Sequence, residues 1–249
     1  MISAVVLTHN SALTLSKTLK SLAFVDQIIV VDDESNDTTV SIAKSHKAVV
    51  VSHPLHDDFA EQRNIGLLQA KGDWVLYVDS DEVVSPALAS EIVEVSRATS
   101  DVKGYMVKRE DMMWGKVLRH GETENVKLLR LARRDAGTWI RPVHEEWKVH
   151  GLLGNLSYPL LHTPHPNVSK FLESVGRYST INAHYLYKQK TNVSVWHIIA
   201  YPVAKFFINY IVRMGFLDGT PGIVLALMMS FHSFLVRSKL WLLTHHSKS

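Results

Sequence analysis

The sequence predicts an α/β fold in which a mostly parallel sheet is flanked by helices. Three observations support this prediction. Short apolar runs rich in valine and isoleucine alternate with segments of helical periodicity over the first 98 residues, as is typical of a parallel sheet. These runs end in polar, often acidic, loops. The chain has 249 residues, enough for one large domain with an appendage.

Four strands are expected in this part of the chain. The β-branched run 3–8 ends in a polar turn, and the run 27–31 is closed by Asp32-Asp33-Glu34. The valine-rich run 48–51 and the apolar run 75–78 complete the set. Because parallel strands share a direction, the polar loops after the first, second and fourth strands fall on one edge, where open α/β sheets bind ligands.

Four helices are expected around these strands. Leu15, Leu19 and Leu22 recur on one face of the first helix, which is helical spacing. Gly72 marks the end of the third helix, and Ser85-Pro86 supplies an N-cap and a first helical residue for the fourth. The expected helices are residues 12–22, 38–45, 59–70 and 86–98.

After residue 98 the pattern becomes mixed. The runs 104–108 and 126–131 have the character of strands, 139–150 is densely polar and aromatic, and 168–189 is periodic as a helix. The absence of cysteine excludes disulfides, thiolate catalysis and cysteine-ligated metals.

The last part of the chain is apolar and basic. The segment 197–214 is interrupted only by Lys205, Asn209 and Arg213, which share one helical stripe. A second apolar run, 223–236, has 14 residues, fewer than the roughly 20 that span a bilayer. We therefore expect two helices lying in the membrane interface. A helical hairpin packed on the sheet or at a dimer interface is the alternative.

Charge supports contact with a membrane. Residues 196–249 carry five Lys/Arg and one acid, or +4, so the net charge of +3 leaves −1 for the rest of the chain. A basic, apolar segment suits an anionic membrane surface better than nucleic acid.

We expect an α/β domain at residues 1–190, in two parts, 1–98 and 99–190. A helical extension is expected at 191–249.

The most informative segment is Asp79-Ser80-Asp81-Glu82, which directly follows the fourth strand. Burying an unpaired carboxylate is costly, so this cluster belongs at the exposed end of the strand. Carboxylate oxygens are ligands that Mg²⁺ and Mn²⁺ prefer, often beside substrate phosphates. The segment therefore predicts a divalent cation site, although it also fits a polar strand end running into a helix.

Four blocks occur in order along the chain, at residues 5–10, 30–38, 61–66 and 72–82. Together they resemble the nucleotide-sugar half of family 2 glycosyltransferases. Downstream lie Val143-His144-Glu145, His162 and the segment 215–219. These are similar to the branch of this family that acts on the lipopolysaccharide core, as in the enzyme that adds glucose to inner-core heptose. The resemblance implies that residues 1–98 are the nucleotide-sugar half and residues 99–190 the acceptor half of a catalytic domain.

The resemblance implies a GT-A fold and an inverting, metal-dependent transfer from a nucleotide-sugar, with UDP-hexose the expected donor. Thr8, Asn10, Arg63 and Asp79 are then expected at the nucleotide-sugar, with Asp32 or Asp33 accepting hydrogen bonds from the base. Asp81 would ligate Mg²⁺ or Mn²⁺, with Asp79 supporting it.

On the acceptor side, the resemblance implies that Glu145 removes the proton of the attacking hydroxyl. Its neighbour Glu146 is the alternative base. His144 and His162 are implied to contact acceptor or phosphate. The expected acceptor is a membrane-linked glycan or lipid such as the lipopolysaccharide core. The expected location is peripheral, at the cytoplasmic face of the plasma membrane.

Other classes fit less well. A nucleotidyltransferase of similar fold would normally carry a glycine-rich, basic loop after the first strand, where this chain has Thr8-His9-Asn10-Ser11. A phosphoacceptor receiver domain has its acidic pair after the first strand, whereas Asp32-Asp33 follows the second. The sequence alone does not exclude a catalytically inactive relative that binds membranes.

Overall fold

The structure, a computed structural model, describes residues 1–142 and 145–246. The chain forms two compact units. We call residues 1–110 and 126–162 the sheet unit, and residues 111–125 and 163 onward the helical unit. The expected boundary at residue 190 differs from this division, because the helix expected at 168–189 packs with the C-terminal helices.

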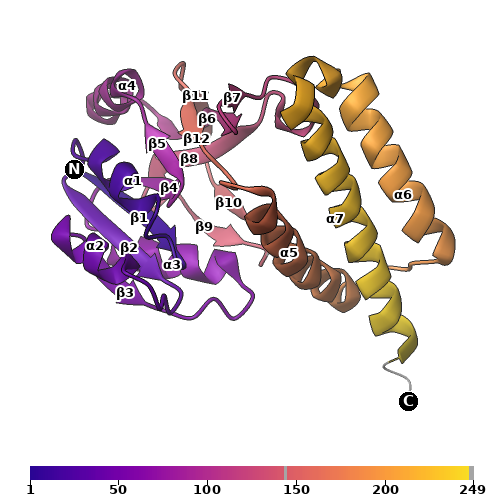
Figure 1. The fold of residues 1–249 in the computed structure, drawn as a ribbon. Helices are drawn as coiled ribbons and strands as arrows, with labels where there is room; N and C mark the ends of the chain where they lie inside the picture. The colour runs from indigo at the N-terminus through magenta and orange to yellow at the C-terminus, as the bar shows by residue number, and fades with distance from the viewer. Residues whose placement is uncertain (143–144, 247–249) are drawn as a thin grey trace. The chain divides into compact units, whose positions relative to one another are not determined.

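A mixed sheet forms the centre of the sheet unit (Figure 1). Its strand order is β3-β2-β1-β4-β8-β6-β12-β5, and β11 pairs with β6. The strands are β1 Ile2–Thr8, β2 Gln27–Asp32, β3 Val49–Ser52, β4 Trp74–Asp79, β5 Glu82–Val84, β6 Val102–Met113, β8 Lys127–Arg133, β11 Leu152–Asn155 and β12 Leu160–His162, and a separate two-stranded hairpin is β9 Gly137–Ile140 with β10 Glu146–Val149.

The first four strands are parallel, as the sequence predicts, and the parallel register brings their polar ends together. Leu7 pairs with Val31 of β2 on one side and Asp79 of β4 on the other, and Thr8 pairs with Asp32. Beyond β4 the sheet becomes antiparallel at β8 and β6. The GT-A prediction is thus confirmed as a parallel half extended by antiparallel strands.

Alternating side chains divide the core between the two faces of the sheet. Ala4 and Val6 pack in one apolar cluster with the helices α1 and α4, whereas Val5 and Tyr77 pack in another with α3 and the β9–β10 hairpin. This alternation follows from the period of two in a strand. The helices of the sheet unit are α1 Leu15–Ser21, α2 Thr39–Ser45, α3 Phe59–Gln69 and α4 Pro86–Arg97.

Capping side chains mark the first residues of helices α3 and α4. Ser85 Oγ accepts a hydrogen bond from Leu88 N at 3.2 Å and Pro86 begins α4, as the sequence predicts. Asp58 Oδ1 accepts from Glu61 N at 3.0 Å and begins α3. Such caps satisfy backbone donors that a helix leaves open.

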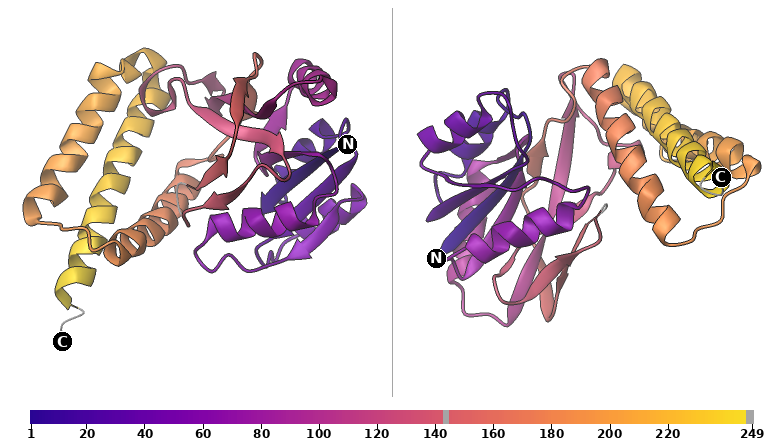
Figure 2. Two further views of the ribbon diagram at one scale, coloured as in Figure 1. Left: turned by 180° about the vertical axis from the view of Figure 1, so that it is seen from behind. Right: turned by 90° about the horizontal axis from the view of Figure 1, so that it is seen from below.

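The helical unit is built on α7, which packs along both α5 and α6 (Figures 1 and 2). A short segment, residues 111–125, packs with it and contains β7 and a single turn of 3₁₀ helix. The elements are β7 Lys116–Val117, the 3₁₀ turn Gly121–Thr123, α5 Val168–Lys188, α6 Val195–Phe207 with a π-turn Ile208–Val212, a 3₁₀ turn Gly215–Asp218, and α7 Gly219–His246.

The apolar run 223–236 lies within a longer helix, α7, which has 28 residues. Its polar side chains find partners inside the unit. Arg237 lies 4.0 Å from the ring centre of Tyr201, and Lys239 Nζ donates to Ser179 Oγ at 2.8 Å and Thr180 Oγ1 at 2.7 Å. By length and composition, 195–212 and 215–245 could each cross a membrane.

Two glycines on helices test this packing. In α3, a Cβ on Gly66 would overlap Val5 Cγ1 and lie 3.2 Å from Val31 Cγ2. Gly66→Ala should therefore lower the free energy of unfolding by about 1–3 kcal/mol. In α5, a Cβ on Gly176 meets nothing within 4 Å. Gly176→Ala should therefore raise the free energy of unfolding by up to about 1 kcal/mol. Urea unfolding followed by circular dichroism measures both, and equal shifts for the two variants would contradict the packing.

Candidate active site

The carboxyl ends of β1 and β2 meet in a network of hydrogen bonds. Asp32, 2% exposed, accepts from Thr8 Oγ1 at 2.8 Å, from Ser35 Oγ at 2.6 Å and from Ser35 N at 2.9 Å. Both of its carboxylate oxygens therefore hold the turn after β2. Asn10, at φ 48°, joins the two turns, since it accepts from Asn36 N at 2.9 Å and donates its own N–H to Ser35 Oγ.

Asp33 lies nearer the surface of the same edge. Its Oδ1 accepts from Leu55 N at 2.8 Å, and its Oδ2 lies 3.3 Å from His9 Nδ1. The structure thus gathers Thr8, Asn10, Asp32 and Asp33 at one edge. Of the two expected base contacts, Asp33 lies nearer the surface, whereas Asp32 is buried.

A buried cluster of charges follows β4. Arg130 Nη2 donates to Asp79 Oδ2 at 2.6 Å and to Glu82 Oε1 at 2.9 Å. Arg63 Nη2 donates to Asp79 Oδ1 at 3.0 Å and to Glu145 Oε1 at 2.7 Å. Two cations therefore hold three carboxyl groups that come from distant parts of the sequence.

The arginines control the ionisation of this cluster. Burial alone would raise the pKa of the Asp79 carboxyl, but Arg130 and Arg63 outweigh burial and hold that pKa well below its usual range. Burial raises the pKa of Glu82, whose side chain is fully buried, against the opposing pull of Arg130. Burial would lower the pKa of the Arg130 guanidinium, but Asp79 and Glu82 raise it. Both arginines therefore stay charged.

Sequence reasoning missed Arg130. It lies in β8 and is 4% exposed, between Leu129 and Leu131. A lone cation inside an apolar strand is a signal for a buried carboxylate partner. The sequence does not identify that partner.

Asp81 and His162 form a second pair beside the cluster. His162 Nε2 lies 3.4 Å from Asp81 Oδ2, and the pairing of β12 with β5 brings them together. A carboxylate oxygen and an imidazole nitrogen suit a divalent cation. Asp79, the other expected ligand, has both carboxylate oxygens engaged by arginine. The residues present therefore fit a cation at Asp81 and His162.

Another group in the described residues has ligand atoms within 4.8 Å of one another, namely His53, His56 and Glu61. His53 Nδ1 is buried there without a hydrogen-bond partner among the described residues. Ligating histidines usually have their other ring nitrogen held by a partner. This group fits a cation less well than Asp81 and His162.

The structure separates the two candidate bases. Glu145 points to Arg63 and is 19% exposed on its side chain. Glu146 begins β10, is exposed, and pairs with Ile140 in the hairpin. Glu145 thus belongs to the charged cluster, whereas none of the described contacts connects Glu146 with it. His144, an expected acceptor contact, lies outside the described residues.

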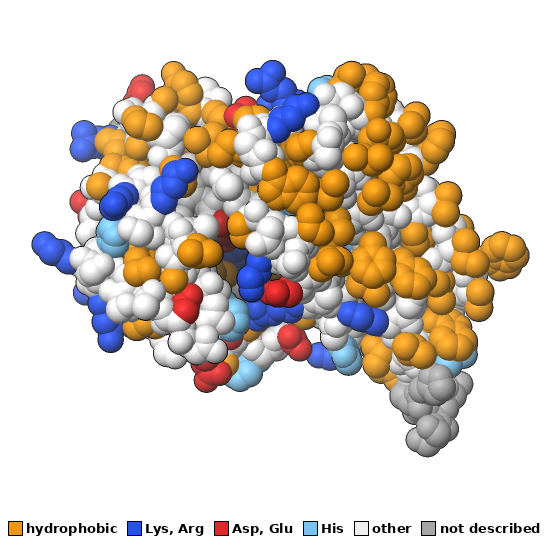
Figure 3. Space-filling model, in the orientation of Figure 1, with side chains coloured by type: hydrophobic (Ala, Val, Ile, Leu, Met, Phe, Trp, Pro, Cys, Tyr) orange, Lys and Arg blue, Asp and Glu red, His pale blue; other side chains and the backbone are white. Residues whose placement is uncertain are grey.

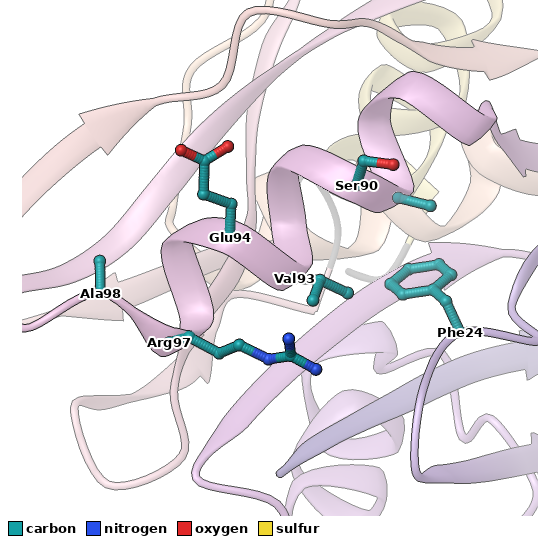
Figure 4. A pocket seen from close by; sticks show the side chains of 7 residues that line it. Phe24, Ser90, Val93, Glu94, Arg97 and Ala98 are labelled. Atoms are coloured by element: carbon teal, nitrogen blue, oxygen red, sulfur yellow. The ribbon is translucent and has the colours of Figure 1, made fainter.

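An open hollow lies elsewhere on the sheet unit (Figure 4). Phe24 precedes β2, and Val93, Glu94 and Arg97 belong to the last half of α4. These positions are at the amino ends of the parallel strands, whereas ligands bind at the carboxyl ends. We therefore place the site at the charged cluster and not in this hollow.

Comparison with known proteins identifies the family. The family model for Glycosyl transferase family 2 matches residues 3–146, which include both strand-end networks. The chain belongs to glycosyl transferase family 2. A nucleotidyltransferase or a receiver domain is thereby set aside.

Curated relatives match nearly the whole chain. An uncharacterized glycosyltransferase of Rickettsia felis is 27% identical over 96% of this chain and 89% of its own length. The lipopolysaccharide core biosynthesis glycosyltransferase LpsC of Rhizobium meliloti is 26% identical over 96% of this chain and 92% of its own. The similarity therefore extends through the helical unit.

Solved structures show the same fold. S. aureus TarS 1–349 in complex with UDP has a TM-score of 0.50 and 16% identity, and the match covers 98% of this chain and 91% of that one. Glucosyl-3-phosphoglycerate synthase from Mycobacterium tuberculosis, with Mn²⁺, UDP and phosphoglyceric acid, has a TM-score of 0.50 and 19% identity over 75% and 77%.

Removal of Arg130 tests the buried cluster. Arg130→Met leaves Glu82 fully buried beside Asp79, so we expect the free energy of unfolding to fall by about 3–5 kcal/mol. Adding Glu82→Gln to this variant should recover part of the loss. The matched control is Arg134→Met, an exposed arginine just beyond β8, with an expected change within about 0.5 kcal/mol. Chemical denaturation measures all three, and equal effects for Arg130 and Arg134 would contradict the assignment.

Proposed function

We propose that this glycosyltransferase inverts the anomeric centre as it moves a sugar, with UDP-hexose as donor, to a hydroxyl of a membrane-linked glycan or lipid. The main support for this proposal is the position of the charged side chains on the sheet. The nucleotide-side network at the ends of β1 and β2 and the carboxylates after β4 lie on the same sheet edge, with Glu145 beside them. Such an edge is where open α/β sheets bind nucleotides.

The donor side uses the strand-end residues. Asp33 accepts hydrogen bonds from the base, and Thr8 and Asn10 hold the turns that shape its site. Asp79, kept ionised and oriented by two arginines, lies at the diphosphate end. The fold neighbours whose structures contain UDP support a UDP-sugar as the donor.

The acceptor side needs a base. The acceptor hydroxyl oxygen bonds to the anomeric carbon while the bond from that carbon to the diphosphate oxygen breaks, and the electron pair leaves on the diphosphate. The hydroxyl proton passes to Glu145. Only Oε1 of Glu145 accepts hydrogen bonds from the described residues, which leaves Oε2 for this proton.

Asp81 and His162 would hold the cation. A bound Mg²⁺ or Mn²⁺ supplies neutralisation of the charge that develops on the departing diphosphate. The mycobacterial synthase, a neighbour in fold, has a structure with Mn²⁺ and UDP, which supports the use of a divalent cation.

The acceptor proposal rests on LpsC and on the helical unit. Apolar side chains gather over α6 and α7 in Figure 3. On α6, the exposed residues Trp196, Ile199, Val203 and Phe207 share one helical stripe. An apolar stripe on an exposed helix suits burial at the boundary between headgroups and acyl chains.

The polar stripe of α6 is used within the helical unit. Lys205 Nζ donates to Glu122 Oε1 at 2.7 Å, and Asn209 Nδ2 donates to Glu122 Oε2 at 2.6 Å. These groups would be costly to bury in hydrocarbon. They support a peripheral arrangement with the apolar stripe toward lipid. We propose that this arrangement is at the cytoplasmic face of the plasma membrane.

A thermal-shift screen tests the donor and cation. We expect UDP-hexose with Mn²⁺ to raise the melting temperature more than GDP-, CMP- or dTDP-sugars, because a ligand bound only by the folded state stabilises it. Asp81→Asn should lose the Mn²⁺-dependent part of this rise and also turnover. Asp101→Asn, an exposed aspartate before β6, is the control and should keep both. Unchanged turnover in Asp81→Asn would exclude the proposed cation site.

Flotation with vesicles tests the membrane proposal. Wild-type protein should float with vesicles that contain anionic lipid and be released by alkaline carbonate, as a peripheral protein is. The triple variant Trp196→Ser, Val203→Ser, Phe207→Ser should stay at the bottom of the gradient. Leu68→Ser, which changes an exposed leucine on α3, should float as wild type does. Equal flotation of both variants, or resistance to carbonate, would contradict the proposal.

A further inference from the structure

Three consecutive residues of α3 connect it to different parts of the sheet unit. Gln62 Nε2 donates to the carbonyl of His53 at 2.8 Å. Arg63 reaches Asp79 and Glu145. Asn64 reaches the hairpin strand β9. The segment thus does more than present one cation near the nucleotide.

Asn64 pairs with the backbone of β9 in both directions. Its Nδ2 donates to Trp139 O at 2.9 Å, and its Oδ1 accepts from Trp139 N at 2.9 Å. The side-chain amide therefore takes the place of a neighbouring strand at this position. A third contact joins α3 to the chain between β9 and β10. At the start of α3, Phe59 N donates to Pro142 O at 3.0 Å.

The β9–β10 hairpin depends on such contacts. It is a two-stranded sheet apart from the main sheet, and a hairpin of this kind is marginally stable alone. Its buried side is Trp139 stacked on Trp147 with ring centres 5.3 Å apart, against Tyr77. Glu145 lies immediately before β10, so the hairpin determines where that carboxylate lies.

Arg63 fixes Glu145 directly. Its Nε and Nη2 donate to the same oxygen, Oε1, at 2.9 and 2.7 Å. Its guanidinium lies 4.6 Å from the ring centre of Trp139, the residue that Asn64 holds. Arg63 and Asn64 therefore act on one structure from neighbouring positions.

We propose that Arg63 and Asn64 are positioning residues that set the Glu145 carboxylate opposite Asp79, Asn64 through the backbone of Trp139 and Arg63 through Oε1. This inference rests on the proposed function, in which Glu145 is the base. It assigns Arg63 and Asn64 to the acceptor side of the reaction, while Arg63 also contacts Asp79 on the donor side. A guanidinium that holds both Asp79 and Glu145 keeps the two sides of the reaction at a fixed separation.

Steady-state kinetics test this role. Arg63→Lys keeps the positive charge but loses the pair of guanidinium nitrogens that donate to Glu145 Oε1. Asn64→Asp still accepts the hydrogen bond from Trp139 N but cannot donate to Trp139 O. Each should lower kcat by about 10- to 100-fold, because a displacement of about 1 Å of a reacting group has effects of this size. For Asn64→Asp, the KM for UDP-hexose should stay within about twofold, because Asn64 contacts only the hairpin and uniform donor binding is untouched.

A double-mutant cycle distinguishes positioning from other roles. In a Glu145→Gln background, Asn64→Asp and Arg63→Lys should lower kcat little further, since residues that act through one group are not additive. Leu68→Ala, an exposed position on the same helix, should leave kcat unchanged. Circular dichroism confirms that each variant is folded.

Two results would overturn the inference. A raised donor KM with unchanged kcat in Arg63→Lys would make Arg63 a donor contact, a role that its Nη1, buried without a partner among the described residues, would serve. Fully additive losses in the Glu145→Gln background would show that the pair does not act through Glu145. If Glu145→Gln itself retains wild-type kcat while UDP-hexose still binds, the proposed base is wrong, which is a separate failure.

Discussion

The structure of this glycosyltransferase depends on one interaction, the hold of two buried arginines on three carboxyl groups. Arg63 and Arg130 join β4, α3, β8 and the start of β10. Desolvation makes such a cluster expensive, and apolar residues of the same volume would often stabilise a fold equally well. We therefore propose that the cluster serves the reaction as well as joining these elements.

The fold supplies the support for this cluster. The alternation of side chains along β4 sends Tyr77 to the face covered by α3 and the β9–β10 hairpin, while Asp79 follows at the end of the strand. Tyr77 donates its hydroxyl to Arg63 O at 2.9 Å. This face of the sheet therefore carries the packed rings of Tyr77, Trp139 and Trp147, and the arginine–carboxylate cluster lies at its edge. Rigid support of this kind is what a preorganised site needs.

Much of this was predictable from the sequence, because the signals were local. The parallel strands, the start of α4 at Ser85 and the family all follow from periodicity, caps and motif order. Arg130 was not predictable, since its partner Asp79 is far away in the sequence and only the order of strands in the sheet brings them together. The choice between Glu145 and Glu146 also needed the register of the hairpin. The sequence also did not show that α7 continues past residue 236, where Arg237 and Lys239 have partners on other helices.

We propose that one edge of the sheet holds the donor, with the base facing it. A crystal structure with UDP and Mn²⁺ tests this placement. We expect the uracil against Asp33, the Mn²⁺ on Asp81 and His162, and the Glu145 carboxylate on the open side of the diphosphate. A nucleotide bound away from the ends of β1, β2 and β4, or Mn²⁺ held by His53 and His56 instead, would contradict it.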